Sequence, residues 1–388
     1  MAPARRTRIL IVDDSAVMRS LLRSVVSSDP GLEVAGTAAD GASALNSLAL
    51  NCPDLILLDV EMPVMDGLVT LRELRRRGNR MPVIMCSSLT QRGARVTIEA
   101  LAGGASDYVT KPTGQSGREA ATRALAQELI PKIRALTNSS RIPSPAQPIL
   151  PGAPRVALAF PSGVPTSAPP RLQPITSVPT VVAIGVSTGG PAALDVLLPA
   201  LPAAFPLPVL IVQHMPELFT RLFAERLNSR CSLRVHEASE GEPVCAGTIY
   251  IARGNWHLEV LTAVIPNAPP SLHLTQGPLE NHCRPAVDVL FRSAARVYGS
   301  GVLAVVLTGM GSDGLSGCRI IREQAGTVLA QDEASSTVWG MPGAVATAGL
   351  AHKILPLEAI APEILRITGR ARSQALLPSR DLNRQAVS

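Results

Sequence analysis

Short runs of apolar residues alternate with stretches of helical spacing along most of the chain. In the first third, the runs are typical of buried strands and cover residues 8–12, 32–35, 54–58, 82–86 and 107–109. Runs of the same kind return later, at residues 181–184, 209–212, 248–251, 302–307 and 327–330. Helical periodicity marks the stretches between them, such as residues 16–27, 191–198, 218–227 and 285–297. This alternation predicts parallel sheets that are covered by helices on both faces.

A proline-rich stretch interrupts the pattern between about residues 137 and 179. It contains no acidic residue, and its charges come from Arg141, Arg155 and Arg171. Proline at this density blocks helices and sheet ladders alike. A tether between two folded parts is therefore a better interpretation of this stretch than a recognition segment.

The length of the chain agrees with two folded parts. The chain has 388 residues, whereas one hydrophobic core rarely serves more than about 250–300 residues. We therefore expect two doubly wound α/β domains. Residues 1–130 form a five-stranded, flavodoxin-like domain, and residues 179–370 form a domain with a mainly parallel sheet. Residues 131–178 are the linker, and residues 371–388 are a C-terminal tail.

The composition is typical of packed domains. Hydrophobic residues make up 46% of the chain and charged residues 17%, which argues against global disorder. No apolar run approaches the roughly 18 residues of a membrane helix, and the six cysteines form no C-x-x-C pair. We expect a cytoplasmic protein with reduced thiols that is not inserted in a membrane. The net charge of +6 permits an anionic partner, but it is too small for this length to indicate nucleic acid.

Polar residues follow four of the first five predicted strands. Asp13 and Asp14 follow the first strand, Asp59 the third, Ser87 the fourth and Lys111 the fifth. Each of the aspartates or the serine alone could be a helix cap. Together they should converge, because the carboxyl ends of parallel strands lie at one edge of the sheet. Clustered carboxylates suit Mg²⁺, so the pattern predicts a phosphoryl-transfer site with Asp59 as the nucleophile.

The first 130 residues resemble a bacterial response-regulator receiver domain. The motifs that carry the resemblance are Val12-Asp13-Asp14-Ser15, Asp59 with Met62-Pro63 and Asp66-Gly67, Ser87, and Lys111-Pro112. The resemblance implies that a histidine kinase phosphorylates Asp59. It also implies that Mg²⁺ is held by Asp13, Asp14, Asp59 and the carbonyl of Glu61. Ser87, Tyr108 and Lys111 match the residues of the family's phosphorylation switch.

Three polar residues follow strands of the second predicted sheet and could form a serine-hydrolase site. Ser187 lies in a Gly-x-Ser-x-Gly turn between a strand and a helix, which suits an exposed nucleophile. His214 follows the next strand as a candidate base, and Asp313 follows a later one as its orienting acid. Backbone amides at Thr188 and Met310 are candidates for an oxyanion hole. The alternatives are a phosphate-binding turn, a surface histidine and a turn aspartate.

The chain order of these residues differs from that of the common α/β hydrolases. The order here is Ser, His, Asp, whereas those enzymes have Ser, Asp or Glu, then His. Asp332 also follows a strand, but the only later histidine, His352, has no comparable setting. The sequence therefore disfavours a standard α/β hydrolase.

Residues 178–368 resemble the catalytic domain of the protein-glutamate methylesterases of bacterial chemotaxis. The resemblance rests on the motifs at residues 185–191, 213–215, 284–288, 308–314, 331–336 and 340–342. It implies Ser187 as nucleophile, His214 as base and Asp313 as orienter. The implied substrates are glutamate γ-methyl esters of chemoreceptors (methyl-accepting chemotaxis proteins), which release methanol, and receptor glutamines, which are deamidated. It also implies that hydrolysis needs no cofactor and that the unphosphorylated receiver covers the active site.

Other functions stay open on the sequence alone. A response regulator with a DNA-binding output would need a recognition helix and a basic stripe, whereas the arginines of the second half are scattered. A small-molecule serine esterase would use the same residues without needing receptor protein or phosphorylation. A degenerate enzyme that acts as a scaffold is a third alternative, although all three proposed catalytic residues are present.

Overall fold

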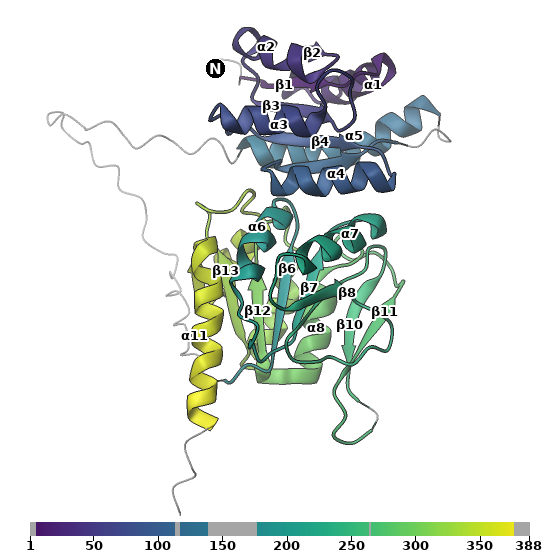
Figure 1. The fold of residues 1–388 in the computed structure, drawn as a ribbon. Coiled ribbons are helices and arrows are strands. Elements are labelled where there is room, and N and C mark those ends of the chain that lie inside the picture. The colour runs from purple at the N-terminus through teal and green to yellow at the C-terminus, as the bar shows by residue number, and fades with distance from the viewer. Residues whose placement is uncertain (1–4, 113–116, 139–176, 264, 376–388) are drawn as a thin grey trace, which may run out of the picture.

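The N-terminal strands form one five-stranded parallel sheet. The computed structural model describes residues 5–112, 117–138, 177–263 and 265–375, so most of the predicted linker and the end of the predicted tail lie outside the described residues (Figure 1). The strand order is β2-β1-β3-β4-β5. The strands are β1 (Thr7–Val12), β2 (Leu32–Ala38), β3 (Leu55–Asp59), β4 (Val83–Ser87) and β5 (Asp107–Thr110).

Helices cover both faces of this sheet because alternate strand residues point to opposite sides. Ile9 and Ile11 belong to the core beneath α1 and α5, whereas Leu10 and Val12 belong to the core of the other face. Strands that are buried on both faces read as continuous apolar runs, which is why the sequence revealed them. The helices are α1 (Ala16–Ser27), α2 (Gly41–Asn51), α3 (Gly67–Arg76), α4 (Gln91–Ala102) and α5 (Arg118–Asn138).

The second sheet has seven parallel strands in the order β14-β13-β12-β6-β7-β9-β8. They are β6 (Val181–Val186), β7 (Val209–Gln213), β8 (Arg234–Glu237), β9 (Thr248–Ile251), β12 (Val302–Val306), β13 (Thr327–Gln331) and β14 (Lys353–Leu355). A separate antiparallel pair consists of β10 (His257–Leu261) and β11 (Ser271–Thr275). The expectation of two doubly wound α/β folds is confirmed. The strand prediction missed β8, β10, β11 and β14, which are short or partly exposed.

Two sets of helices cover the second sheet. One core contains residues of α6 (Gly190–Leu197), α7 (Glu217–Asn228) and α11 (Leu357–Ala375). The other contains residues of α8 (Val287–Tyr298), α9 (Leu315–Glu323) and α10 (Met341–Thr347). Short 3₁₀ helices, η1 (Leu198–Ala200) and η2 (Gly299–Gly301), follow α6 and α8. Chain order reverses beside β6, because β7 lies on one side of it and β12 on the other; ligands of such sheets bind at this point.

Two helices extend past the boundaries that the sequence predicted. Helix α5 continues through Pro131 to Asn138, although the linker was expected to begin at residue 131. The buried side chains of Ile133 and Leu136 pack in the same core as the earlier part of the helix. The burial of these two side chains stabilises the helix by more than the missing backbone N–H of Pro131 destabilises it. Helix α11 similarly continues to Ala375, past the predicted start of the tail at residue 371.

The two sheets meet through helices of both folds. Helix α4 packs against α6 and α7. The first fold therefore lies on the side of the second fold that carries α6 and α7 (Figure 1). One continuous hydrophobic core contains Leu101 and Tyr108 from the first fold and Phe219 and Leu222 from the second. Within the described ranges, no helix combines the length and the apolar character that crossing a membrane requires.

Candidate functional site

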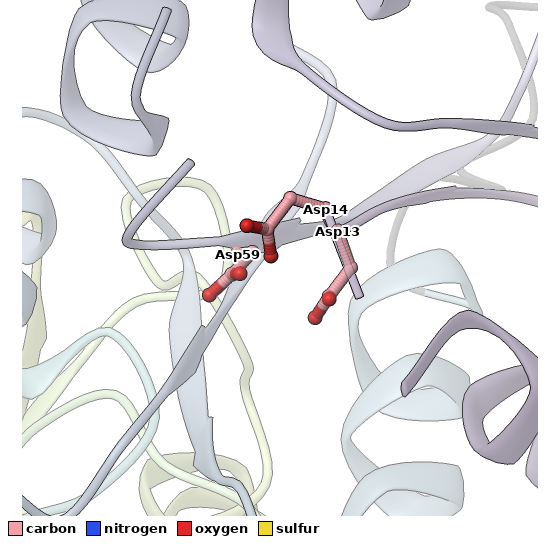
Figure 2. A group of neighbouring side chains, drawn as sticks. All are labelled: Asp13, Asp14 and Asp59. Atoms are coloured by element: carbon pink, nitrogen blue, oxygen red, sulfur yellow. The ribbon is translucent and has the colours of Figure 1, made fainter. Parts of the chain in front are cut away.

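Three carboxylates lie together at the carboxyl edge of the first sheet. Asp13 and Asp14 follow β1, and Asp59 ends the neighbouring strand β3 (Figure 2). Oxygen atoms of the three side chains lie within 4.8 Å of one another, with Asp13 and Asp59 buried and Asp14 exposed. This set of closely spaced carboxylate oxygens fits a hard cation such as Mg²⁺.

Lys111 offsets part of the negative charge of this cluster. Its Nζ atom lies 2.8 Å from Asp13 Oδ2 and 2.7 Å from Asp59 Oδ1. Burial raises the pKa of Asp59 to about 6, although the Lys111 ammonium lowers it. The structure thus brings the predicted phosphoacceptor, two further acidic residues and the predicted lysine into direct proximity.

The remaining residues of the predicted switch occupy different surroundings. Ser87 ends β4, which lies beside β3, and its hydroxyl donates to the carbonyl of Ser88 at 3.2 Å. The ring of Tyr108 stacks on Phe219 of α7, with 4.6 Å between ring centroids and 16° between ring planes. The Glu61 side chain lies 3.5 Å from Arg92, and the metal contact expected from its backbone carbonyl stays a prediction.

Ser187 lies in a tight turn at the end of β6. Its amide donates to the Thr308 carbonyl at 3.0 Å, and its carbonyl accepts from the Gly190 amide at 2.8 Å. Gly189 adopts φ 78° as the turn enters α6. Gly309 is close enough that an added Cβ would lie 2.8 Å from Ser187 Cβ. The loop after β12 therefore approaches Ser187 closely only because residue 309 is glycine.

His214 and Asp313 form a partly buried hydrogen-bonded pair. His214 Nε2 lies 2.8 Å from Asp313 Oδ2, and His214 Nδ1 lies 3.7 Å from Cys283 Sγ. Burial disfavours the imidazolium, but the interactions with Asp313 and Cys283 outweigh this effect and raise the pKa of His214 to about 9. Burial alone would raise the pKa of Asp313, yet hydrogen bonds from His214 and from backbone amides hold it below its usual value.

Ser187, His214 and Met310 line one cavity of about 490 Å³. Among the described residues, no hydrogen bond joins Ser187 to His214. Because His214 Nε2 faces Asp313, Nδ1 is the nitrogen that could serve the serine, and in this structure it lies 3.7 Å from Cys283 Sγ. The backbone N–H groups of Thr188 and Met310 donate no hydrogen bond within the described parts of the chain. Both residues line this cavity, and free backbone amides are what an oxyanion hole requires.

The same cavity is lined by residues of the first fold. Helix α5 contributes Glu128 and Lys132, and β5 contributes Asp107. Asp107 Oδ2 accepts a hydrogen bond from Thr188 Oγ1 at 2.6 Å, and both side chains are buried. Lys132 Nζ donates to the Tyr108 carbonyl at 2.6 Å and lies 3.3 Å from Asp107 Oδ1. The first fold therefore covers the neighbour of Ser187 directly.

The sequence analysis missed several residues of this site. Asp107 had been part of a predicted strand, and nothing local marked it as a contact to the second fold. The sequence predicts no role for Gln213, yet its Nε2 donates to the Ser187 carbonyl at 3.0 Å. Cys283, which faces His214, was counted only as a reduced thiol. A polar residue at a strand end was the available signal for Gln213, whereas Cys283 and Asp107 had none.

Comparison with known proteins gives consistent matches across the chain. Residues 182–364 match the CheB methylesterase family, and residues 9–122 match the response regulator receiver domain. A protein-glutamate methylesterase/protein-glutamine glutaminase of Nocardioides sp. is 49% identical over 372 residues, which cover 96% of this chain and 98% of that protein. The protein of the same name from Trichodesmium erythraeum is 47% identical over 366 residues, covering 93% and 99%. The crystal structure of the Thermotoga maritima CheB methylesterase catalytic domain is 41% identical, with a TM-score of 0.47, and covers 49% of this chain and 100% of that chain.

Asp14→Asn should weaken Mg²⁺ binding by about tenfold or more. Loss of a residue that only hydrogen-bonds to a metal ligand already lowers metal affinity by about 10–100-fold, and Asp14 is predicted to bind the ion directly. Asp14 is the exposed member of the cluster, and Lys111 pairs with the other two. The substitution therefore removes a ligand and leaves those ion pairs in place. Titration calorimetry of the full chain with MgCl₂ measures the affinity. The control is Asp40→Asn, an exposed cap of α2 outside the cluster; equal losses in both variants would contradict the assignment.

Proposed function

The chain belongs to the CheB methylesterase family and carries a response-regulator receiver domain, and from this membership we propose a phosphorylation-activated serine hydrolase. Its substrates are glutamate γ-methyl esters of chemoreceptors, which yield glutamate and methanol, and receptor glutamines, which yield glutamate and ammonia. The observation that carries the proposal is the His214–Asp313 pair, whose histidine lines the same cavity as Ser187. The relatives that cover nearly the whole chain are named for both activities.

The proposed reaction is an acyl transfer through Ser187. His214 takes the proton of Ser187 as the hydroxyl oxygen attacks the γ-carbonyl carbon, and Asp313 stabilises the imidazolium that forms. The N–H groups of Thr188 and Met310 bind the oxyanion of the tetrahedral intermediate. Collapse breaks the bond to the methoxy or amino group, which takes the proton from His214 and leaves as methanol or ammonia. Water activated by His214 then cleaves the acyl-serine and restores the hydroxyl.

The proposed control begins at Asp59. A histidine kinase supplies the phosphoryl group, which a carboxylate oxygen of Asp59 accepts by attack on phosphorus. Receiver phosphorylation generally depends on Mg²⁺, and Asp13, Asp14, Asp59 and the Glu61 carbonyl would hold the ion, which neutralises charge on the phosphoryl oxygens. Lys111 contacts Asp59 directly and can move its charge to the new phosphoryl oxygens. Ser87, on the neighbouring strand, is the proposed hydroxyl partner of the phosphoryl group.

The contacts between the folds support an autoinhibitory role for the receiver. Asp107 holds Thr188, the residue next to the nucleophile, and Tyr108 stacks on Phe219. The two contacting residues are adjacent in β5, so a change in the position of Tyr108 on phosphorylation also shifts Asp107. We infer that this movement uncovers the cavity for a receptor helix. Five of the cysteines are free thiols, which supports a cytoplasmic location for the reaction; they are Cys86, Cys231, Cys245, Cys283 and Cys318.

Two alternative functions that the sequence leaves open, a DNA-binding output and a small-molecule esterase, differ in how far the family membership weakens them. A DNA-binding output conflicts with membership of residues 182–364 in the methylesterase family. A small-molecule esterase would use the same Ser187 site, so substrate tests must separate it. Hydrolysis of small esters that ignores both receptor protein and phosphodonor would favour that reading over ours.

Ser187→Ala should reduce methanol release by about a thousandfold or more, because alanine lacks the hydroxyl oxygen that attacks the ester and carries the acyl group. Methanol is measured from methylated receptor membranes with Mg²⁺ and acetyl phosphate present. Ser229→Ala, at the exposed end of α7, is the matched control and should keep the wild-type rate. Turnover near wild type in Ser187→Ala would remove Ser187 as the nucleophile.

Asp59→Asn should abolish the increase in methanol release that acetyl phosphate produces while keeping the basal rate. The side chain keeps its size, but an amide cannot accept the phosphoryl group. The paired measurement compares rates with and without phosphodonor, using Asp40→Asn as the control. A variant that still responds fully would place the phosphoryl group on another residue.

Asp107→Asn should raise the basal rate by about fivefold, because a hydrogen bond to a charged acceptor stabilises by about 1.5–3 kcal/mol and a neutral amide keeps part of it. The rate after phosphorylation should match that of the wild type, since the contact is already broken there. Methanol release is compared in both states. An unchanged basal rate would show that the Thr188–Asp107 contact does not limit access.

A further inference from the structure

A tight turn at residues 280–283 lies beside the His214–Asp313 pair. The amide of Glu280 donates to the Cys283 carbonyl at 3.1 Å, and the amide of Cys283 donates back to the Glu280 carbonyl at 2.8 Å. The two central residues, Asn281 and His282, have φ angles of 51° and 63°. Positive φ at both positions defines a type I′ turn, in which asparagine is among the better-tolerated residues. Glu280 pairs with Arg292 of α8 and so fixes the turn to that helix.

The side chain of Asn281 bridges two buried carboxylates. Its Nδ2 donates to Asp313 Oδ1 at 2.8 Å and to Asp288 Oδ2 at 3.0 Å. Asp288 and Asp313 are only 4% and 3% exposed. The amide nitrogen has two hydrogens, one for each carboxylate, whereas the amide oxygen in its place would face two acceptors. The chemistry therefore fixes the orientation of this amide.

The bridge fixes the oxygen of Asp313 that does not bind His214. Backbone amides of Val287 and Asp288, in the first turn of α8, donate to Asp313 at 2.7 and 3.0 Å. Among the described side chains, Asn281 supplies the donor to Oδ1 and His214 the donor to Oδ2. The Gly314 amide also donates to Oδ1, at 2.9 Å. Rotation of the carboxylate would break both sets of bonds, so the Asn281 bond acts together with these backbone amides to set the direction in which Oδ2 points.

The bridge also separates two like charges. Burial raises the pKa of Asp288, and the nearby charge of Asp313 raises it further. The N–H groups between the carboxylates place partial positive charge where the repulsion is strongest. Without them, the field that His214 experiences becomes more negative, and the imidazolium is favoured over the neutral base.

We propose that Asn281 is a positioning residue of the esterase, which bridges Asp288 and Asp313 and so orients the carboxylate that holds His214. This inference rests on the proposed function of Ser187 and His214. Asn281 does not touch the reacting atoms in this assignment; it acts through Asp313. Other charged or titratable groups near this part of the site are Glu280, His282 and Cys283 on the turn, Arg292 on α8 and, across the cavity, Asp107, Glu128 and Lys132.

The test uses two substitutions of Asn281 and one of Asn267 in the full chain with Mg²⁺ and acetyl phosphate. Asn281→Gly keeps the left-handed backbone and removes the amide, and it should lower kcat about tenfold while KM for methylated receptor membranes stays within about twofold. Asn267→Gly makes the same change at an exposed left-handed asparagine between β10 and β11, outside the cavity, and should retain the wild-type kcat. Equal kcat in Asn281→Gly and wild type would overturn the proposal.

The second variant gives a readout that a purely structural role would not move. Asn281→Asp tolerates the same backbone but adds a carboxylate, which favours the protonated form of His214. The rise of kcat/KM with pH should therefore move to higher pH by about one unit. An unshifted profile would contradict the proposal even if the variant were less active. Thermal unfolding of each variant separates loss of fold from loss of positioning.

Nuclear magnetic resonance keeps the inference separate from the proposed function. The pKa of His214 is followed by titration of its ring resonances in the wild type and in Asn281→Asp, with no substrate present. A raised pKa supports the bridge, and an unchanged pKa overturns it. Failure of the wild type to release methanol from any receptor membrane would instead count against the proposed function alone.

Discussion

The negative charge of Asp313 organises the catalytic face of this protein. A buried charge without partners would cost several kcal/mol, and Asp313 is almost fully buried. Its partners come from separate parts of the chain: His214 after β7, Asn281 in a tight turn, and the first-turn amides of α8. Each segment satisfies the same carboxylate, so satisfying that charge also fixes the geometry of the loops that surround Ser187.

The acidic cluster of the receiver differs from the Asp313 site because its negative charge is only partly compensated. There the carboxylates are gathered without enough internal donors, and Lys111 offsets only part of their charge. Burial leaves Asp59 with a raised pKa, so its charged form gains from any added cation. One sheet edge thus holds a charge that is already satisfied, and the other holds negative charges that a bound cation would balance.

Much of this could be predicted from the sequence because both sheets are buried on two faces. Their strands appear as apolar runs, and the polar residue after each run marks the carboxyl edge, which located Asp59, His214 and Asp313. Contacts between distant segments had no such signal. The bridge from Asn281 depends on two positive φ angles and on a helix that begins after it, and the stacking of Tyr108 on Phe219 joins different folds. Helix α5 continues past Pro131 because the burial of later residues outweighs the tendency of proline to end a helix.

The contact between Asp107 and Thr188 has a consequence for how such proteins diverge. Thr188 makes this contact with its side-chain hydroxyl, whereas the proposed oxyanion hole uses its backbone N–H, which every residue except proline supplies. Asp107 lies in the receiver and has no part in the chemistry of hydrolysis. Either partner of this contact can therefore change without removing a group that the proposed chemistry uses. The strength with which the receiver covers the site can be adjusted from both folds, separately from the rate of hydrolysis itself.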